Sequence, residues 1–334
     1  MKQVILILML AALLFSSCSP DKTLTERDIY LISVSDDFYD STGHYNALDN
    51  TINDQAALIS QIGTLGNVHT YAFISHKGRR YVTTPDKTPV FNPADSKCNT
   101  LESESPEDEA FDHFEYIPSS TETKAWTMDD VLATVGNLHT GENDIIIFTY
   151  SGHGEEKTGA LLTNCRGKDN YDTTNKEAVI EAFSSISGKK LFFLDSCYSG
   201  NFISESTLNT LDTFTTDEDE YEGEDYIAAI KCSTLTKTTD TTPSLWIMAA
   251  SGRRQKANDS GDGTDSAIQD HYGAFTYYLL KALGYNMDRN ESEKRTSSLT
   301  FYSIYSYIMA SFPSSEITSQ TPRTSLKRLD VKLR

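Results

Sequence analysis

The segment 144–150, DIIIFTY, is apolar on both of its faces, and this restricts the folds open to the chain more than any other stretch does. A strand without a polar face is typical of the centre of a parallel sheet that helices cover on both sides. Other runs with strand character lie at 28–34, 68–75, 190–194, 245–250 and 326–333. Segments with helical periodicity lie between them, at 51–62, 128–138, 174–186, 272–283 and 298–312. Strands that alternate with helices in this way predict an α/β fold, in which a mainly parallel sheet lies between two layers of helices.

We expect one domain over 25–334, because no Pro- or Gly-rich linker divides this part of the chain. Two acidic insertions interrupt the pattern, at about 85–124 and 204–244. Their most acidic parts carry few large aliphatic side chains, so we expect both to be surface loops. Their carboxylates, like those of NDSGDGTD at 258–265, are suitable oxygen ligands for calcium. Ca²⁺ is therefore the one cofactor that the sequence suggests.

The first eighteen residues have the features of an export signal. Lys2 supplies a positive start, the stretch 4–15 is apolar, and small residues precede Cys18. Twelve apolar residues are too few to span a bilayer as a helix, but they fit the core of a secretory signal. The ending Ser-Ser-Cys resembles that of a bacterial lipoprotein signal, which implies that Cys18 is lipidated and begins the mature chain. We therefore expect an exported protein that is lipid-anchored in the cell envelope, with a plain secreted protein as the alternative.

The net charge of −19 argues against a nucleic-acid-binding protein, because the chain offers no concentrated cationic face to phosphates. The same charge is compatible with attraction of cationic substrates. Four cysteines follow the signal, which is too few for a disulfide scaffold. One disulfide among Cys98, Cys165 and Cys232 stays open, and its pairing cannot be assigned from the sequence. No CxxC pair or HExxH motif occurs, so we expect no metal site of the zinc type.

A histidine and a cysteine occupy equivalent places after two of the predicted strands. His153 follows the strand at 144–150 by three residues, and Cys197 follows the strand at 190–194 by three. Functional residues of parallel sheets gather beyond the carboxyl ends of strands, so the two side chains meet if these strands are neighbours. A thiol beside an imidazole reaches the nucleophilic thiolate form, and the backbone N–H groups of Gly154 and Cys197 are then candidate oxyanion donors. A structural cysteine in the core and a solvated histidine are the alternative interpretation.

Two short motifs resemble those of a known family. YSGHG at 150–154 and DSCYSG at 195–200 resemble the His and Cys motifs of the caspase–metacaspase family of cysteine peptidases. The similarity covers most of the chain after the signal, and includes IYLISVS, NALDNTINDQAAL, LWIMAASGRRQKA, YGAFTYYLLKAL and SLTFYSIYSYI. It implies a three-layer α/β/α fold around a mainly parallel six-stranded sheet. It also implies that Cys197 is the nucleophile and His153 the general acid/base, with no cofactor required for the chemistry.

The family's first specificity pocket, which receives the substrate's P1 residue, is basic in caspases and acidic in metacaspases. Asp195, two residues before the cysteine, and Asp54 of the segment IND match the acidic version. Two carboxylates pair well with a guanidinium or ammonium group, so the resemblance implies protein or peptide substrates with Arg or Lys at P1. Structural roles stay open for both, with Asp54 as a helix cap and Asp195 as a support of its loop. Asp36 and Asp37, after the first strand, are further candidates for the pocket.

Members of the family are often cut between the Cys-bearing and C-terminal parts of the fold. The insertion at 204–244 lies at this junction and contains Lys231 and Lys237, so self-processing is a natural expectation. Two alternatives stay open. One is a catalytically idle caspase-like module that binds peptides or proteins, and the other is a peptidase of the clostripain or legumain type with a different P1 preference. We expect a monomer that contacts the membrane only through its lipid anchor.

Overall fold

The computed structural model describes eleven parts of the chain, namely 27–38, 48, 50–76, 113–118, 126–165, 170–203, 244–258, 272–295, 297–313, 320–325 and 331–334. The predicted signal with Cys18, most of both acidic insertions and nearly all of the NDSGDGTD segment lie outside the described residues. Cys98 and Cys232 lie outside them too. Within the described parts, no helix is long and apolar enough to cross a membrane.

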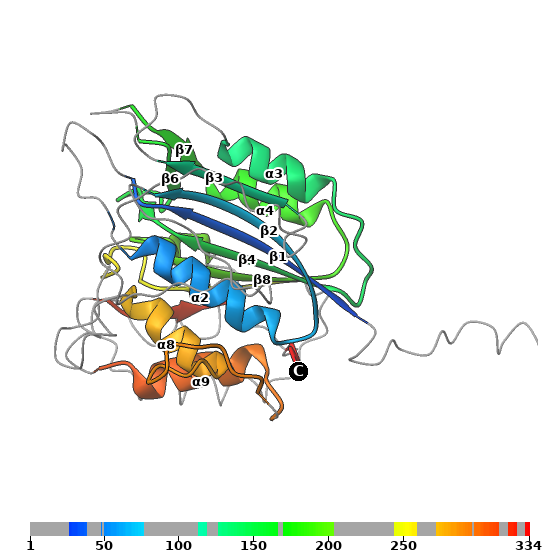
Figure 1. The fold of residues 1–334 in the computed structure, drawn as a ribbon. Helices are drawn as coiled ribbons and strands as arrows, with labels where there is room; N and C mark the ends of the chain where they lie inside the picture. The colour runs from blue at the N-terminus through cyan, green and yellow to red at the C-terminus, as the bar shows by residue number, and fades with distance from the viewer. Residues whose placement is uncertain are drawn as a thin grey trace, which may run out of the picture.

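A seven-stranded sheet forms the centre of the molecule, in the order β10-β9-β8-β4-β1-β2-β3 (Figure 1). The strands are β1 (Asp28–Asp36), β2 (Asn67–His76), β3 (His113–Pro118), β4 (Ile145–Ser151), β8 (Lys189–Asp195), β9 (Leu245–Ala249) and β10 (Arg323–Thr324). Every neighbouring pair is parallel except β9 and β10, which are antiparallel. The predicted α/β fold with a mainly parallel sheet is confirmed.

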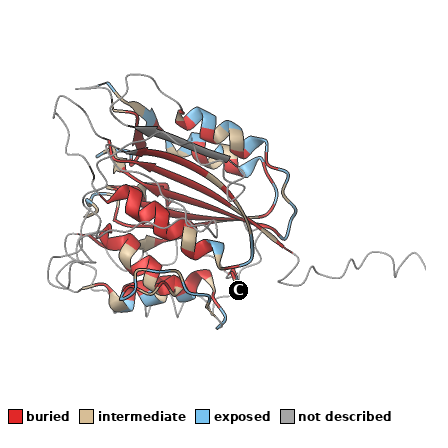
Figure 2. Ribbon diagram, in the orientation of Figure 1, coloured by how far each residue is buried: buried red, intermediate tan, exposed pale blue. Residues whose placement is uncertain are grey.

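Helices cover both faces of this sheet and make three layers (Figure 1). On one face lie α2 (Thr51–Gly63), α8 (Ala274–Leu283) and α9 (Phe301–Ser311), and on the other lie α3 (Met128–Gly136) and α4 (Lys176–Ser184). The central strand β4 serves both cores, because Ile145 and Ile147 pack with the first group while Ile146 and Phe148 pack with the second. Its seven residues are all buried, as Figure 2 shows for the central strands in general.

The edges of the sheet differ from the sequence-based expectation. The insertion at 85–124, expected to be a surface loop, contributes β3, which pairs in parallel with β2. The last strand was expected at 326–333, of which 326–330 lie outside the described residues. Lys332 forms an isolated antiparallel bridge with Thr300, and the strand β10, two residues long, lies just before the expected segment. The sheet therefore has six mutually parallel strands plus a short antiparallel one, rather than six in all.

A second, three-stranded antiparallel sheet consists of β5 (His153–Gly154), β6 (Leu161–Thr163) and β7 (Asp172–Thr174). The sequence did not predict it. Thr174 and Glu177 have the spacing of a capping box, but Thr174 belongs to β7, and the cap of α4 is Asn175, without a side-chain hydrogen bond. Pairing with β6 takes precedence over the local helix signal at this position.

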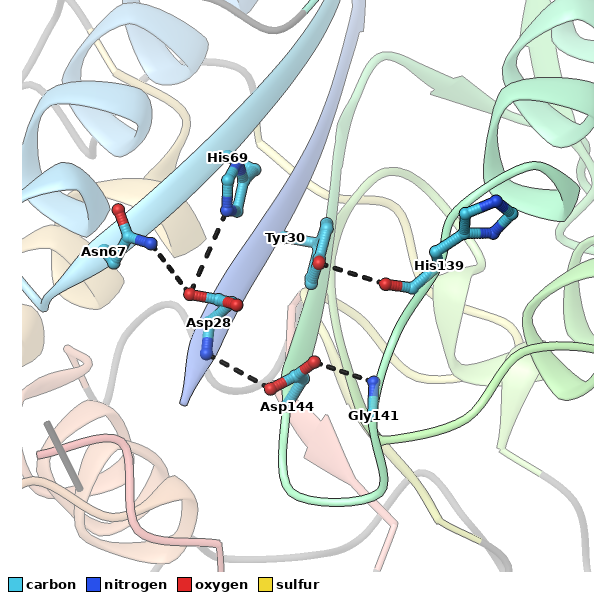
Figure 3. A network of polar contacts seen from close by, with 7 residues as sticks. All are labelled: Asp28, Tyr30, Asn67, His69, His139, Gly141 and Asp144. Carbon is cyan, nitrogen blue, oxygen red and sulfur yellow. Dashed lines mark hydrogen bonds and ion pairs between the residues drawn. The ribbon is translucent and has the colours of Figure 1, made fainter. Parts of the chain in front are cut away.

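The amino ends of the central strands are held by a network around Asp144 (Figure 3). One oxygen of its carboxylate accepts the backbone N–H of Asp28 at 3.2 Å, and the other accepts that of Gly141 at 2.7 Å. Asp144 thus joins the start of β1 to the loop before β4. Asp28 in turn accepts a hydrogen bond from the Asn67 amide at 2.7 Å, which ties the start of β2 to the same point.

Candidate active site

The register of β4 and β8 brings the predicted cysteine and histidine together. Ser151 pairs with Asp195 at the carboxyl ends of these two neighbouring parallel strands. His153 and Cys197 each follow this pair by two residues. Both line a single cavity of about 810 Å³. The expectation that imidazole and thiol share one cleft therefore agrees with the structure.

Gly154 lets the histidine segment approach the cysteine segment closely. A Cβ atom at this position would lie 1.9 Å from the Cys197 carbonyl oxygen, so no other residue fits without a shift of the backbone. The Tyr150 hydroxyl lies 2.9 Å from the His153 carbonyl oxygen and 2.7 Å from that of Leu162. This buried hydroxyl thus lies between the backbones of β5 and β6, at the two residues that pair there, and it helps to hold the His153 main chain in place.

The two backbone N–H groups expected to stabilise an oxyanion have suitable surroundings. The Glu155 N–H donates to the Ala160 carbonyl at 2.9 Å, and hydrogen-bonded pairs alternate along an antiparallel ladder. Gly154, paired with Leu161, is therefore in a non-hydrogen-bonded position, and its N–H points away from β6. Among the described residues, no carbonyl accepts the Cys197 N–H. Neither N–H group thus donates a hydrogen bond to a neighbouring strand.

The Cys197 thiol is half-buried beside the loop that follows β9. The Ala257 N–H lies 3.4 Å from its Sγ atom. Burial raises the pKa of this thiol most strongly, and the charge of Asp195 raises it further. The Ala257 N–H and the Lys256 ammonium group act in the opposite direction. The net effect is upward, so the resting group is a thiol, and it needs a base when it reacts.

Asp54 and Asp195 converge on the start of α8 although they come from different elements. Asp54 is 1 % exposed and accepts hydrogen bonds from the Ser151 hydroxyl at 2.7 Å and the Gly273 N–H at 2.9 Å. Asp195 is 8 % exposed and accepts the Thr276 N–H at 3.1 Å and the Thr276 hydroxyl at 2.7 Å through one oxygen, Oδ2. Both line the cavity. They thereby cap α8, which has no side-chain cap of its own.

The approach of the two carboxylates requires a glycine between them. A Cβ atom at Gly273 would lie 2.5 Å from the Asp195 Oδ2 atom and 3.1 Å from the Asp54 Oδ2 atom. Burial raises the pKa of Asp195 to about 6, although both hydrogen bonds from Thr276 act to lower it. At neutral pH this carboxylate is therefore mostly ionised, in a cavity wall from which water is largely excluded.

Other predicted and unpredicted residues also have definite places. Asp36 and Asp37, proposed as further pocket residues, are buried but do not line the cavity. Lining residues that the sequence did not single out include Glu156, Tyr171, Lys256, Asn258 and Gly273. Glu156 follows His153 by three residues, and Lys256 lies in the segment LWIMAASGRRQKA, whereas only the fold brings Tyr171 to the cavity. Within the described parts of the chain, no group of three or more His, Cys, Asp or Glu residues is arranged to hold a metal ion.

Comparison with known proteins gives a consistent family assignment. The family model for the caspase domain matches residues 31–333. No protein with a curated description matches the chain. Similar solved structures include protein GSU0716 of Geobacter sulfurreducens, at 15 % identity and a TM-score of 0.41, with 89 % of this chain and 92 % of that chain covered. Caspase-1 of Spodoptera frugiperda is similar at 11 % identity and a TM-score of 0.42, with 89 % and 87 % covered.

Because both TM-scores lie below 0.5, the assignment rests on the family model alone. The model match extends over nearly the whole described fold, from the first strand to the end of the chain. It includes both short motifs from which the resemblance was first inferred. The chain belongs to the caspase-domain family, which is a family of cysteine peptidases.

Proposed function

We propose that this protein is a cysteine endopeptidase that cleaves peptide bonds after Arg or Lys. One observation carries the proposal: Cys197 and His153 line the same cavity as two buried carboxylates, those of Asp54 and Asp195. A nucleophile with its base accounts for the reaction, and the paired acids account for the choice of substrate. The negative net charge of the chain, −19, favours cationic ligands in the same sense.

The proposed reaction uses His153 first as a base and then as an acid. His153 takes the thiol proton of Cys197 as the sulfur attacks the carbonyl carbon of the substrate. The N–H groups of Gly154 and Cys197 donate to the carbonyl oxygen as it becomes negative. Because neither donates to a neighbouring strand, no hydrogen bond of the sheets has to break first. The imidazolium then protonates the leaving amine, and water hydrolyses the thioester. The raised pKa of the thiol makes this base essential, because the resting enzyme holds little thiolate.

The specificity pocket in this proposal is the wall formed by Asp54 and Asp195. Both hydrogen bonds from Thr276 to Asp195 use Oδ2, and Oδ1 has no protein partner among the described residues. A guanidinium or ammonium group placed there would form a charge-assisted hydrogen bond with a carboxylate that is largely removed from water. The cap that Asp195 provides for α8 is thus compatible with its proposed role in binding. Both oxygens of Asp54 accept hydrogen bonds, from Ser151 and Gly273, so in this proposal Asp54 contributes mainly its negative charge.

A panel of four fluorogenic peptides tests the proposal. The peptides end in Arg, Lys, Asn or Asp and are otherwise identical, and they are incubated with the wild-type protein and with Cys197→Ala. Turnover of the Arg and Lys peptides by the wild type alone is the expected result. Preference for the Asn or Asp peptide would contradict the assigned specificity. If no peptide is turned over, with or without calcium and reductant, the proposed activity is wrong.

One observation favours a second candidate, a caspase-like module that binds peptides without cleaving them. Burial and Asp195 together raise the pKa of the Cys197 thiol, which is unfavourable for a nucleophile. Such a module would still use the two carboxylates to bind a cationic side chain. Binding of an Arg peptide to the wild type, measured by calorimetry and accompanied by no cleavage, would support it.

We also propose that the protein is exported, lipid-anchored through Cys18 and processed by itself at Lys231 or Lys237. These positions lie outside the described residues, so the support is the sequence and the connectivity.

The segment 204–243 joins the short helix η1 (Ser199–Phe202), just after Cys197, to β9 and the loop with Ala257. A cut there would leave both lining segments in place on neighbouring strands. A single intact band from fully active protein would argue against processing, and unlabelled Cys18 in cells fed a fatty-acid probe would argue against the anchor.

A further inference from the structure

Asp36 ends the central strand β1 behind the wall of the cavity, and its carboxylate joins two separate loops. One oxygen, Oδ1, accepts the Phe38 N–H at 2.7 Å. The other, Oδ2, accepts the Asn164 N–H at 2.7 Å, although the two residues are 128 positions apart in the chain. The side chain is 1 % exposed. Asp36 is therefore a buried carboxyl group that accepts two short hydrogen bonds from backbone N–H groups.

Phe38, the first of these partners, lies directly against the histidine. Its ring makes an edge-to-face contact with the His153 imidazole, at 5.1 Å between centroids and an angle of 79°. A second contact, at 5.4 Å, joins it to Tyr171, which lines the cavity. The Phe38 backbone has a φ of +54°, a region that bulky residues rarely adopt. An outlier of this kind persists only where its surroundings hold it, and the bond to Asp36 is one such constraint.

Asn164, the second partner, directly follows β6 and joins it to the start of β7. Its side-chain amide donates to the Asp172 carboxylate at 3.0 Å and to the Trp126 carbonyl at 3.2 Å. Its own φ is +55°, a left-handed conformation that asparagine adopts more readily than most residues. Asp36 thus couples the loop with Phe38 to the small sheet that contains His153.

We propose that Asp36 is a positioning residue, whose carboxylate holds Phe38 and Asn164 at the end of β6 so that the Phe38 ring fixes the orientation of the His153 imidazole. The inference rests on the proposed peptidase function and concerns the same site. Asp36 touches no substrate, and its effect passes through Phe38. The edge-to-face contact with Phe38 favours one plane of the imidazole ring.

The surroundings of Asp36 make a purely space-filling role a poor explanation. Burial and the nearby charges of Asp37 and Asp172 all disfavour an ionised carboxylate at this place. An apolar side chain of similar size would avoid that cost, but it would leave the N–H groups of Phe38 and Asn164 without their acceptor. What the carboxylate adds is therefore the geometry of these two loops, and both loops bear on the histidine.

The far end of the same sheet provides a matched control. Asp144 is also buried and also accepts two backbone N–H groups from separate segments, but it lies at the amino ends of the strands (Figure 3). Asp36→Asn and Asp144→Asn make the same chemical change in the same kind of clamp. We expect both variants to unfold at lower urea concentrations than the wild type. We expect Asp36→Asn alone to lower kcat, by about tenfold to 100-fold, because misplacement of a catalytic group by about 1 Å has effects of this size.

The effect should fall on kcat, with KM for the Arg peptide changed by less than about twofold, since the acidic pocket is untouched. Phe38→Ala, which keeps the carboxylate and removes the ring, should lower kcat similarly. The double variant should be no worse than the more affected single variant, because both changes act through one contact. Additive losses, or equal losses of kcat in Asp36→Asn and Asp144→Asn, would overturn the proposal.

A measurement without substrate separates this inference from the proposed activity. In protein labelled with ¹³C in its histidines, the His153 resonance is identified by its loss in His153→Gln. It should shift in Asp36→Asn and in Phe38→Ala and stay in place in Asp144→Asn. A resonance that does not move in Asp36→Asn refutes the positioning role, even if the wild type cleaves peptides. Absence of peptide cleavage with the expected shifts would refute the peptidase function and retain the positioning role.

Discussion

The Cys197 thiol lies between two charges of opposite sign, Asp195 and Lys256, and this makes its pKa adjustable. Asp195→Asn should lower the pKa of the thiol, because the negative charge that raises it is removed. Lys256→Met should raise it, since the ammonium group favours the thiolate. Both shifts are measured from the pH dependence of Cys197 alkylation by iodoacetamide, a neutral reagent that does not depend on the specificity pocket. The same direction of shift in both variants would contradict this account.

Two threonines on neighbouring elements differ in how their buried hydroxyls are satisfied. The Thr163 hydroxyl has no hydrogen-bond partner among the described residues, whereas that of Thr149 lies 3.0 Å from both the Ser33 hydroxyl and the Gln55 amide oxygen. Thr163→Val should therefore leave stability unchanged or raise it by about 1 kcal/mol, while Thr149→Val should lower it by about 1–3 kcal/mol. Urea unfolding of the two variants decides the matter. A larger loss in Thr163→Val than in Thr149→Val would show that Thr163 has a partner in solution.

At the scale of elements, the start of α8 is the point at which the proposed specificity pocket depends on packing. Gly273→Ala would bring a methyl group to within 2.5 Å of the Asp195 carboxylate and 3.1 Å of the Asp54 carboxylate. We expect the two acids to separate, with a loss of roughly tenfold or more in kcat/KM for the Arg peptide. Gly136→Ala, at the end of α3, is the control, because a Cβ atom there would have no neighbour within 4 Å. Equal activities of the two variants would remove Gly273 from the account of the pocket.

The elements that the sequence predicts well are those with strong periodicity or full burial. Strand β4 was identified because it is apolar on both faces, and the positions of His153 and Cys197 followed from the ends of β4 and β8. The strands of the small sheet contain only two or three residues each, too few to show a period, and β3 is hidden within an acidic segment. Local patterns of this length carry little information, so pairing with neighbouring strands determines whether such a segment forms a strand.

The candidate site was predictable to the same extent. Residues within the two motifs, such as Asp195 and Gly154, could be named in advance. Gly273 could not, because it reaches the cavity only through the placement of α8 against the sheet. Lys256 was not named, although its segment LWIMAASGRRQKA was part of the family resemblance. Asp36 was expected in the pocket itself, and the structure places it behind the histidine instead. A carboxylate after a strand has the same appearance in the sequence in either place.

For the whole molecule, the two buried carboxylates with raised pKa values determine a trend of stability with pH. The pKa of Asp36 is raised to about 7 by burial first and by Asp37 second, and that of Asp195 to about 6 by burial. A raised pKa means that the folded state binds the proton more tightly than the unfolded state does. The stability associated with these groups is therefore full below about pH 4 and is lost as the pH rises to about 6–7.

A comparison of two proteins isolates this effect from the other acids. The free energy of unfolding of Asp36→Asn, minus that of the wild type, should increase between about pH 4 and pH 7 and become constant above this range. The value of this difference at low pH contains the cost of the altered hydrogen bonds. Only the slope of the difference with pH reports the titration of Asp36. Urea unfolding at several pH values gives both. A difference that declines with pH would mean that Asp36 titrates below its ordinary range.

The cavity wall is assembled from stretches that begin at Leu48 and end at Gly273, with Thr276 one turn further on. A single domain folds as one cooperative unit, so the two acids are ordered only when α8 has packed against the sheet. A truncated chain that stops before Gly273 would keep its cysteine and histidine but lack the helix that orders both acids. In the proposed peptidase, recognition of a cationic side chain would thus depend on a part of the chain far downstream of the reacting groups.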